Sequence, residues 1–386
     1  MPTELFPDLS VLVENGTSFD SESFEQHIRL LALDGYARTA SPDTELSRFI
    51  KPDNTLFVRR LNTQKQPLLQ YGPNSWLATP ADAPFIPAVF LPFLVALFAE
   101  PRSLAHLIAA QVTQVSILYC GDDGEITLPT SYSSGHCELL LIIVKENVHV
   151  TLYDSVVPSP LELKQEMVCA RSILALVEPH AQVNVLSDHV VSKQDRVMNH
   201  DCWHVGKAAR VSIQEVVLSG YQSWLTKEFK LEEDAHLEYA WLAALKGNEQ
   251  TALSTTQEHT GVKSSSNVLV KTALSENARS FYRGTIRIKE TARHSQANQQ
   301  QKALMISSSA RTCAIPSLEV ATHEVQCRHG SAAGKFNDTE VWYLRSRGFT
   351  LIQAQRLLIE GFFKGDFVRD TPLMKQLPDN VIFRDS

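Results

Sequence analysis

The last third of the chain breaks into short runs of alternating polarity, which limits its fold more than any other feature of the sequence. In the run from Phe281 to Lys289, Tyr282 and Ile286 fall on one face of a strand and Arg283 and Arg287 on the other. Similar runs predict further strands at 268–274, 303–307, 318–321 and 325–328. The sequence therefore predicts a region built from short strands.

Near the end of the chain the sequence pattern changes from that of strands to that of helices. Two helices are predicted, Asp338–Ser346 and Leu351–Phe363, separated by the pair Arg347-Gly348, because glycine commonly terminates a helix. We expect these helices to close the strand-rich region.

The first two thirds mix strands with helices. Apolar runs predict strands at 114–120, 139–144, 148–152 and 182–186, and helices are expected over 160–177, from 202 to about 217 and over 220–245. The segment 248–266 is polar and rich in Ser, Thr and Gln, which is typical of a domain junction. We therefore predict an α+β chain with four parts: an extension (1–69), a domain (70–247), a linker (248–266) and a final domain (267–386).

Composition excludes several classes of function. A net charge of −7 argues against a general nucleic-acid or membrane-surface binder. The six cysteines are scattered without a C-x-x-C pair, which favours a reducing, cytoplasmic setting over a disulfide framework. The apolar run 85–99 contains Pro87 and Pro92 and is shorter than the roughly 18–20 residues of a membrane span, so it is predicted to be a buried helix.

Cys327 lies in the last predicted strand, 325–328, and His329 follows directly after it, two residues from Cys327. Residues with this spacing project to the same face, so a thiolate and an imidazole there can converge on one iron. The alternative is a buried cysteine beside an exposed histidine at a strand end. Cys313 is expected in the core.

Several ordered segments between 258 and 349 together resemble the core domain of SufB/SufD proteins, the scaffold subunits of iron–sulfur cluster assembly. They include F-Y-R-G-T-I-R-I (281–288), A-L-M-I-S-S-S-A-R-T-C-A-I-P (303–316), Q-C-R-H-G (326–330) and W-Y-L-R-S-R-G-F (342–349). The resemblance implies a parallel β-helix followed by a few helices. Only a short β-helix, the last part of a SufD-like core, is expected here, because the preceding 250 residues look different.

The resemblance also implies partners and a cofactor. SufB/SufD proteins act in SufB–SufD–SufC complexes, in which the SufC ATPase docks on the C-terminal helices and a transient iron–sulfur cluster is thought to form between SufB and SufD. The segment Q-C-R-H-G is similar to the SufD version of the motif, so the resemblance assigns a cluster-ligand role to His329 and a weaker one to Cys327.

A second constellation precedes this region. If the strands on either side of Lys145 form an antiparallel hairpin, His136 lies opposite Asp154, because the residue numbers of paired positions sum to about 290. The acid would then orient the imidazole. Cys202 is predicted to open a helix, whose N-terminus favours the thiolate.

The segments G-H-C-E-L-L-L-I-I-V, V-T-L-Y-D-S and N-H-D-C-W-H-V-G, within residues 70–220, resemble CE-clan cysteine proteases, the class of ubiquitin-like-protein proteases and deubiquitinases. This resemblance implies Cys202 as nucleophile, His136 as general base, Asp154 as its orienter and Gln194 as an oxyanion donor, although Gln194 lies eight positions before Cys202. The alternative is an ordinary hairpin with surface polar residues and a core cysteine.

Three functions remain open from the sequence. The chain is a SufD-like assembly scaffold fused to a cysteine protease-like module, or an active peptidase acting on ubiquitin or a relative, or a fusion whose first part only caps a short β-helix. The peptidase interpretation would also allow a secreted effector.

Overall fold

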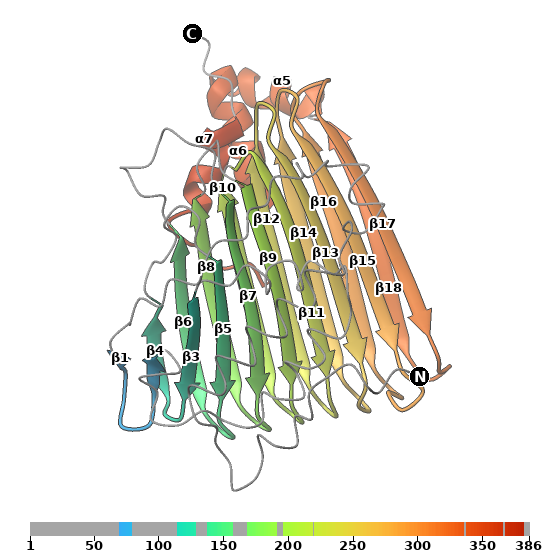
Figure 1. The fold of residues 1–386 in the computed structure, drawn as a ribbon. Coiled ribbons are helices and arrows are strands. Elements are labelled where there is room, and N and C mark those ends of the chain that lie inside the picture. Colours follow the sequence, from blue (N-terminus) through green and yellow to red (C-terminus); the bar gives the residue numbers. More distant parts are fainter. Residues whose placement is uncertain are drawn as a thin grey trace, which may run out of the picture.

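In the computed structural model of this protein, the described residues are 69–78, 114–128, 137–156, 168–190, 196–218, 220–335, 337–365 and 367–381. They form two long sheets followed by a few helices (Figure 1). Apart from the short β1 and β2, every strand pairing is parallel, and the chain passes from one sheet to the other after nearly every strand. This arrangement is a parallel β-solenoid.

Sheet 1, of ten strands, contains β1 (Leu69–Gln70), β2 (Trp76–Ala78), β3 (Gln114–Cys120), β5 (Cys137–Val144), β7 (Val168–Val177), β9 (Arg196–Val205), β11 (Gln222–Leu231), β13 (Gln250–His259), β15 (Arg279–Ile288) and β17 (Arg311–Val320). Sheet 2, of eight strands, contains β4 (Gly124–Thr127), β6 (His149–Val156), β8 (Gln182–Val190), β10 (Arg210–Leu218), β12 (His236–Leu245), β14 (Ser265–Leu274), β16 (Gln296–Met305) and β18 (Gln326–Lys335).

The six successive corners from sheet 1 to sheet 2 between β5 and β16 share one backbone feature. Each has a residue in the left-handed region, with φ between 54° and 62°: Asn147, His180, Ala208, Asp234, Lys263 and His294. The backbone N–H of each donates to a carbonyl in the next corner, as from Asn147 to Pro179 (3.2 Å) and from His180 to Lys207 (2.9 Å). These stacked turns bring successive strands into register.

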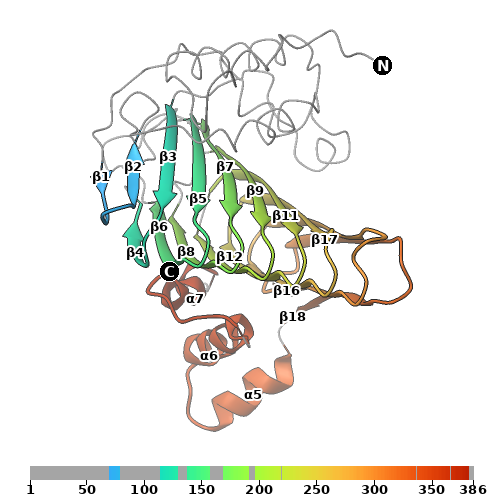
Figure 2. The same cartoon turned by 90° about the horizontal axis from the view of Figure 1, so that it is seen from below.

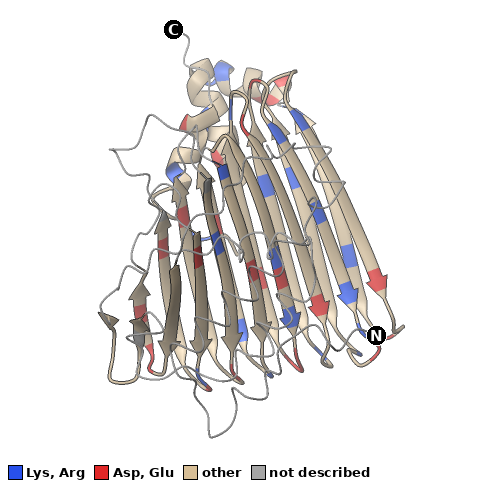
Figure 3. Ribbon diagram, viewed as in Figure 1, with Lys and Arg blue, Asp and Glu red and all other residues tan. Residues whose placement is uncertain are grey.

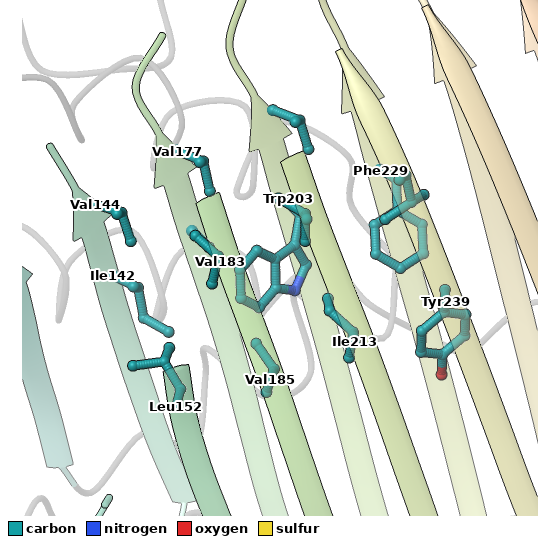
Figure 4. Close-up of a cluster of buried hydrophobic side chains, with 14 of the residues drawn as sticks. Ile142, Val144, Leu152, Val177, Val183, Val185, Trp203, Ile213, Phe229 and Tyr239 are labelled. Atoms are coloured by element: carbon teal, nitrogen blue, oxygen red, sulfur yellow. The ribbon is translucent and has the colours of Figure 1, made fainter. Parts of the chain in front are cut away.

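The apolar core lies between the two sheets. Trp203 and Phe229 point inward from sheet 1 and Tyr239 points inward from sheet 2, with Val183 and Ile213 beside them (Figure 4). All five are nearly inaccessible to solvent. Because every second residue of each strand enters this core, burial of apolar surface holds the sheets together.

The helices are α5 (Asp338–Ser346), α6 (Leu351–Phe363), a 3-10 turn (Met374–Gln376) and α7 (Leu377–Val381). α6 and α7 lie against the outer face of sheet 2, whereas α5 contacts α6 and buries no residue (Figure 2). Ile359 and Phe363 of α6 pack with Leu242 and Ala244 of β12. Both predicted helix ranges, 338–346 and 351–363, are confirmed, and so is the parallel β-helix.

Other predictions were wrong. The described residues of the predicted helices over 160–177, 202–217 and 220–245 form strands β7, β9, β10, β11 and β12. The predicted linker, 248–266, contains β13 and the start of β14, each hydrogen-bonded to strands on both sides. One solenoid therefore runs through the boundary expected between domains 70–247 and 267–386. The β-helix is longer than expected, and the structure gives no support for a protease domain.

The helix predictions failed because both faces of these strands are covered. In β12, Tyr239 and Trp241 enter the interior while Leu242 and Ala244 lie under the C-terminal helices. Two-sided burial removes the alternation by which a strand is recognised, and leucine and alanine favour helices intrinsically. Pairing with β10 and β14 overrides that preference.

Candidate functional site

The solenoid has an open end at β17 and β18. Within the described residues, β17 pairs only with β15 and β18 only with β16, so each strand leaves one edge without a partner. The two edges lie at the same end of the molecule (Figures 1 and 2). Edges of ten-residue strands present rows of free backbone donors and acceptors.

Inward-facing apolar side chains are uncovered at this end. Ile286 of β15 is 0% exposed, whereas Leu318, its register neighbour on β17, is 41% exposed. Likewise Ile288 is 1% exposed and its neighbour Val320 is 41% exposed. The residue types are those of the core, but no further turn of this chain covers them among the described residues.

Cys327 and His329 lie on β18 at this open end. Both belong to register rows of sheet 2 that face the interior, since Cys327 pairs with Ala297 and His329 with Gln299. The predicted shared face is therefore present. Cys327 packs against the cluster of Ile286 and Ile288 and is half-buried, and burial raises the pKa of its thiol. His329 is exposed.

Cys313 points the other way. Its register neighbour Phe281 packs on the outer face of sheet 1 with Trp224, and Cys313 itself is exposed. The expectation of a core position for Cys313 was wrong, because β17 is the edge strand. The open end thus offers one half-buried thiol and one exposed imidazole on its inner side.

The C-terminal helices form a second candidate surface. In α6, Thr350 and Gln353 form a capping box at the N-terminus. At its C-terminal end, Lys271 Nζ donates to the carbonyl oxygens of Phe362 (2.7 Å) and Lys364. Gln214 forms two hydrogen bonds with the backbone of Arg369, of 2.8 Å and 2.7 Å. These contacts fix the C-terminal segment on sheet 2.

The C-terminal helices expose several large apolar side chains. No residue of α5 is buried. The exposed side chains on or between α5 and α6 form what we term the helix patch: Trp342, Tyr343, Phe349, Leu351, Ile352 and Leu357. Trp342 is 70% exposed. Large exposed apolar side chains commonly mark a binding surface for another protein where they form one patch.

The residues of the predicted peptidase site do not come together. His136 and Gln194 lie outside the described residues. Asp154 and Cys202 are on different sheets: Asp154 faces the interior of the solenoid from β6, whereas Cys202 is on the outer face of β9, next to the inward-facing Trp203. The run of residues 85–99 also lies outside the described residues.

The structure explains why the predictions for Asp154 and Cys202 failed. The hairpin that placed Asp154 opposite His136 was wrong, because the left-handed turn at Asn147 sends the chain from β5 in sheet 1 to β6 in sheet 2. Cys202 lies inside a strand, so no helix N-terminus stabilises its thiolate. Burial and then Glu228 raise the pKa of Cys202 to about 12, the reverse of an activated nucleophile.

Asp154 instead has a structural role. Its two carboxylate oxygens accept hydrogen bonds from Arg171 Nη1, at 3.0 and 2.8 Å. Burial alone would raise the pKa of Asp154, but Arg171, His189 and Ser187 outweigh it and lower the pKa to about 2. Sequence analysis missed this buried ionic network, since nothing in the local pattern separates an inward-facing charge from a surface one.

In the described part of the chain, no group of three or more His, Cys, Asp or Glu side chains is arranged to hold a metal ion. No described helix is long and apolar enough to cross a membrane. Any cluster bound at the open end would therefore need ligands beyond Cys327 and His329.

Comparison with known proteins agrees with the fold. Residues 128–362 match the family described as SUF system FeS cluster assembly, SufBD core domain. An iron–sulfur cluster assembly SufBD family protein of Synechocystis is 26% identical over 245 residues, covering 61% of this chain and 53% of that protein.

Two SufD proteins match over shorter stretches. The iron–sulfur cluster assembly protein SufD of Escherichia coli is 29% identical over 147 residues, covering 38% of this chain and 35% of its own length. SufD of Bacillus subtilis is 32% identical over 131 residues, covering 34% of this chain and 28% of its own. The matches thus span about half or less of these relatives. The family match covers more than half of this chain, which therefore belongs to the SufBD family of iron–sulfur cluster assembly proteins.

Proposed function

We propose that this chain is a SufD-like scaffold component of iron–sulfur cluster assembly that works in a complex with a SufB-like scaffold and a SufC-like ATPase. Family membership supports the general role. The observation that carries the more specific proposal is the exposure of Leu318 at the open end, in contrast to its buried neighbour Ile286.

The SufB-like partner binds the open end. Two free strand edges and the inward-facing Leu318 and Val320 offer backbone hydrogen bonds and apolar contacts at the same place. A partner strand added to β17 or β18 would extend a sheet, and its side chains would cover the exposed core residues. A partner with the same solenoid architecture has matching edges.

The nascent cluster is held between the two scaffolds. On this chain, His329 is the proposed ligand and Cys327 a second one, because both face inward at the open end. The described residues supply no complete ligand set, and iron–sulfur clusters usually take four protein ligands. The remaining ligands would come from the partner, so that cluster formation depends on assembly of the complex.

The SufC-like ATPase docks on the helix patch. The patch is apolar and exposed, and it stands on helices that Lys271 and Gln214 hold to sheet 2. Movement of the ATPase on nucleotide binding would thus be transmitted to the solenoid.

No observation favours the peptidase function or a ubiquitin partner. The cytoplasmic setting expected from the scattered cysteines remains a prediction.

The test is co-expression of the full chain with the SufB-like and SufC-like proteins of its own organism, followed by anaerobic purification. We expect a ternary complex that takes up iron and sulfide and shows the visible absorption of a cluster. His329→Ala should reduce that absorption while leaving the complex intact. Assembly of a complex with no cluster signal, or an unchanged signal in the variant, would remove His329 from the proposal.

A further inference from the structure

Strands β5 to β12 each place an ionisable side chain inside the solenoid. The residues are buried, none being more than 7% exposed: Glu138, Asp154, Arg171, His189, Asp201, Glu215, Lys227 and Tyr239. Acidic and basic positions in the middle of the strands are visible in Figure 3. These side chains form what we term the core network, which connects sheet 1 to sheet 2.

The first half of the core network centres on Arg171. Its guanidinium binds both oxygens of Asp154 across the interior and lies 3.4 Å from Glu138. Glu138 also accepts a hydrogen bond from Ser116 (2.8 Å), and Ser187 donates to Asp154 (2.9 Å). Each carboxylate here therefore has a cation and a hydroxyl group beside it.

The second half centres on Lys227. Its ammonium donates to Asp201 on the same sheet and to Glu215 on the opposite sheet, the latter at 2.6 Å. The hydroxyl group of Tyr239 donates to the other oxygen of Glu215 (2.9 Å). Two carboxylates thus share a single positive charge, with solvent excluded from both.

The charges of the core network do not balance when every acid is ionised. Four carboxylates face two permanent cations, which leaves one negative charge in each half of the core network. His189 does not compensate them, because burial lowers the pKa of its imidazole in spite of the nearby Asp154 and Glu215. An uncompensated charge in a protein interior is costly, and a group in that position takes up a proton instead.

We propose that Asp201 and Glu215 form a buried proton-binding site, in which the two carboxyl groups hold one proton between them beside Lys227. The geometry selects this pair, since Arg171 reaches Asp154 through Nη1 and Glu138 through Nε, whereas Asp201 and Glu215 divide the single nitrogen of Lys227. In support, burial and Glu215 keep the pKa of Asp201 above its ordinary value although Lys227 opposes them.

A register row of sheet 2 runs from this site to the open end, with the apolar Val270 between its polar members. The register places Glu215, Trp241, Val270, Gln301 and Ser331 side by side along sheet 2. On sheet 1, four residues before the row of Asp201 and Lys227, the interior carries hydroxyl groups on four successive strands, at Ser223, Thr251, Ser280 and Thr312.

Several polar atoms of these rows are buried without a protein partner among the described residues: Trp241 Nε1, Thr251 Oγ1, Gln301 Nε2 and Thr312 Oγ1. Such atoms are ordinarily satisfied by internal water. We assign the two rows, together with internal water between them, as the route of exchange. A proton from solvent enters near the exposed Ser331, passes between water and hydroxyl groups, and forms an O–H bond with a carboxylate of the pair; release reverses these steps.

Infrared spectroscopy of the full chain tests the site. A protonated carboxyl group has a carbonyl stretch separate from that of a carboxylate, and we expect such a band at neutral pH. Asp201→Asn and Glu215→Gln should each abolish its contribution, whereas Asp154→Asn should leave it. Spectra of the first two variants that match the unmodified protein would overturn the proposal.

Isotope labelling tests the site without any substitution, so the result does not depend on whether a variant folds. In the unmodified protein, ¹³C-carboxyl aspartate or glutamate shifts the band of whichever residue carries the proton, so no substitution is needed. A protonated-carboxyl band that shifts with neither label would overturn the site.

The route has its own test. On transfer into D₂O the carbonyl band of the protonated carboxyl group shifts as deuterium replaces the proton. The double variant Thr251→Val, Thr312→Val should slow this shift. Thr256→Val, on the outer face of β13, is the matched control. Equal rates in all three proteins would contradict exchange along the rows.

Discussion

The middle and the end of the solenoid carry the same inward-facing pattern in different surroundings. Trp203, Phe229, Gln257, Ile286 and Leu318 occupy one register row of sheet 1, on five successive strands. The first four are buried, and only Leu318 is exposed. The difference lies in the missing next turn, not in residue type, which is why the open end is suited to a partner.

Large side chains of this row give the strongest contrast. Trp203→Ala should lower the free energy of unfolding by about 3–5 kcal/mol, because it leaves a cavity in the core. Leu318→Ala should cost less than about 1 kcal/mol in the isolated chain, since its side chain is already partly in water. Urea unfolding of both variants measures the difference; equal losses would show that the end is closed in solution.

Buried charge provides a second contrast, within one strand. Lys227→Met should destabilise the chain by roughly 3–5 kcal/mol, because it leaves Asp201 and Glu215 in the core without their cation. Lys230→Met, on the exposed face of β11, should change stability by less than about 0.5 kcal/mol. A small loss at Lys227 would mean that water reaches the core network.

The two buried aspartates should respond to pH in opposite ways. Asp154 has a folded-state pKa of about 2, below its unfolded value, so its contribution is present above the unfolded pKa and is lost as pH falls toward 2. We expect Asp154→Asn to cost roughly 2–3 kcal/mol at neutral pH and progressively less in acid.

The pKa of Asp201 is raised in the folded state, so its contribution is present below the unfolded pKa and is lost as pH rises through the folded pKa. Asp201→Asn should therefore become more stable relative to the unmodified chain as pH rises. Unfolding midpoints measured across the pH range compare the two variants. Parallel profiles would contradict the assigned charge states.

Two glycines give the smallest contrast. At Gly284 an added Cβ would lie 2.1 Å from Nε2 of the buried Gln299, so Gly284→Ala should cost about 1–3 kcal/mol. At Gly330, on β18, an added Cβ meets nothing within 4 Å, and Gly330→Ala should be nearly neutral. Thermal unfolding of both variants measures the difference in stability. No loss of stability in Gly284→Ala would show that Gln299 moves aside easily.

The parts of the fold that sequence could predict are those with a clear local period. The helices at 338–346 and 351–363 and the two faces of β15 were found in this way. β12 was taken for a helix because the C-terminal segment covers its outer face, a tertiary contact that no local pattern reveals. The corner residues Asn147, Ala208 and Lys263 share a conformation but not a residue type, so the repeat is hidden in the sequence.

The candidate site, like the fold, could be predicted only where its features depend on local sequence. Spacing alone placed Cys327 and His329 on one face, because the period of a strand is local. The open end could not be predicted, since the exposure of Leu318 depends on whether another turn of the solenoid covers it. Lys227 and Asp201 resemble surface charges in the sequence, and only the register between strands brings them together inside the core.

The affinity of the chain for its SufB-like partner tests the central claim most directly. Leu318 and Ile315 lie on the same strand, are 41% and 42% exposed, and point to opposite faces of sheet 1. If the inner face of the open end binds the partner, Leu318→Asp should weaken binding by about thirtyfold or more. Ile315→Asp should change it far less. Equal affinities of the two variants would contradict a partner seated on the open end.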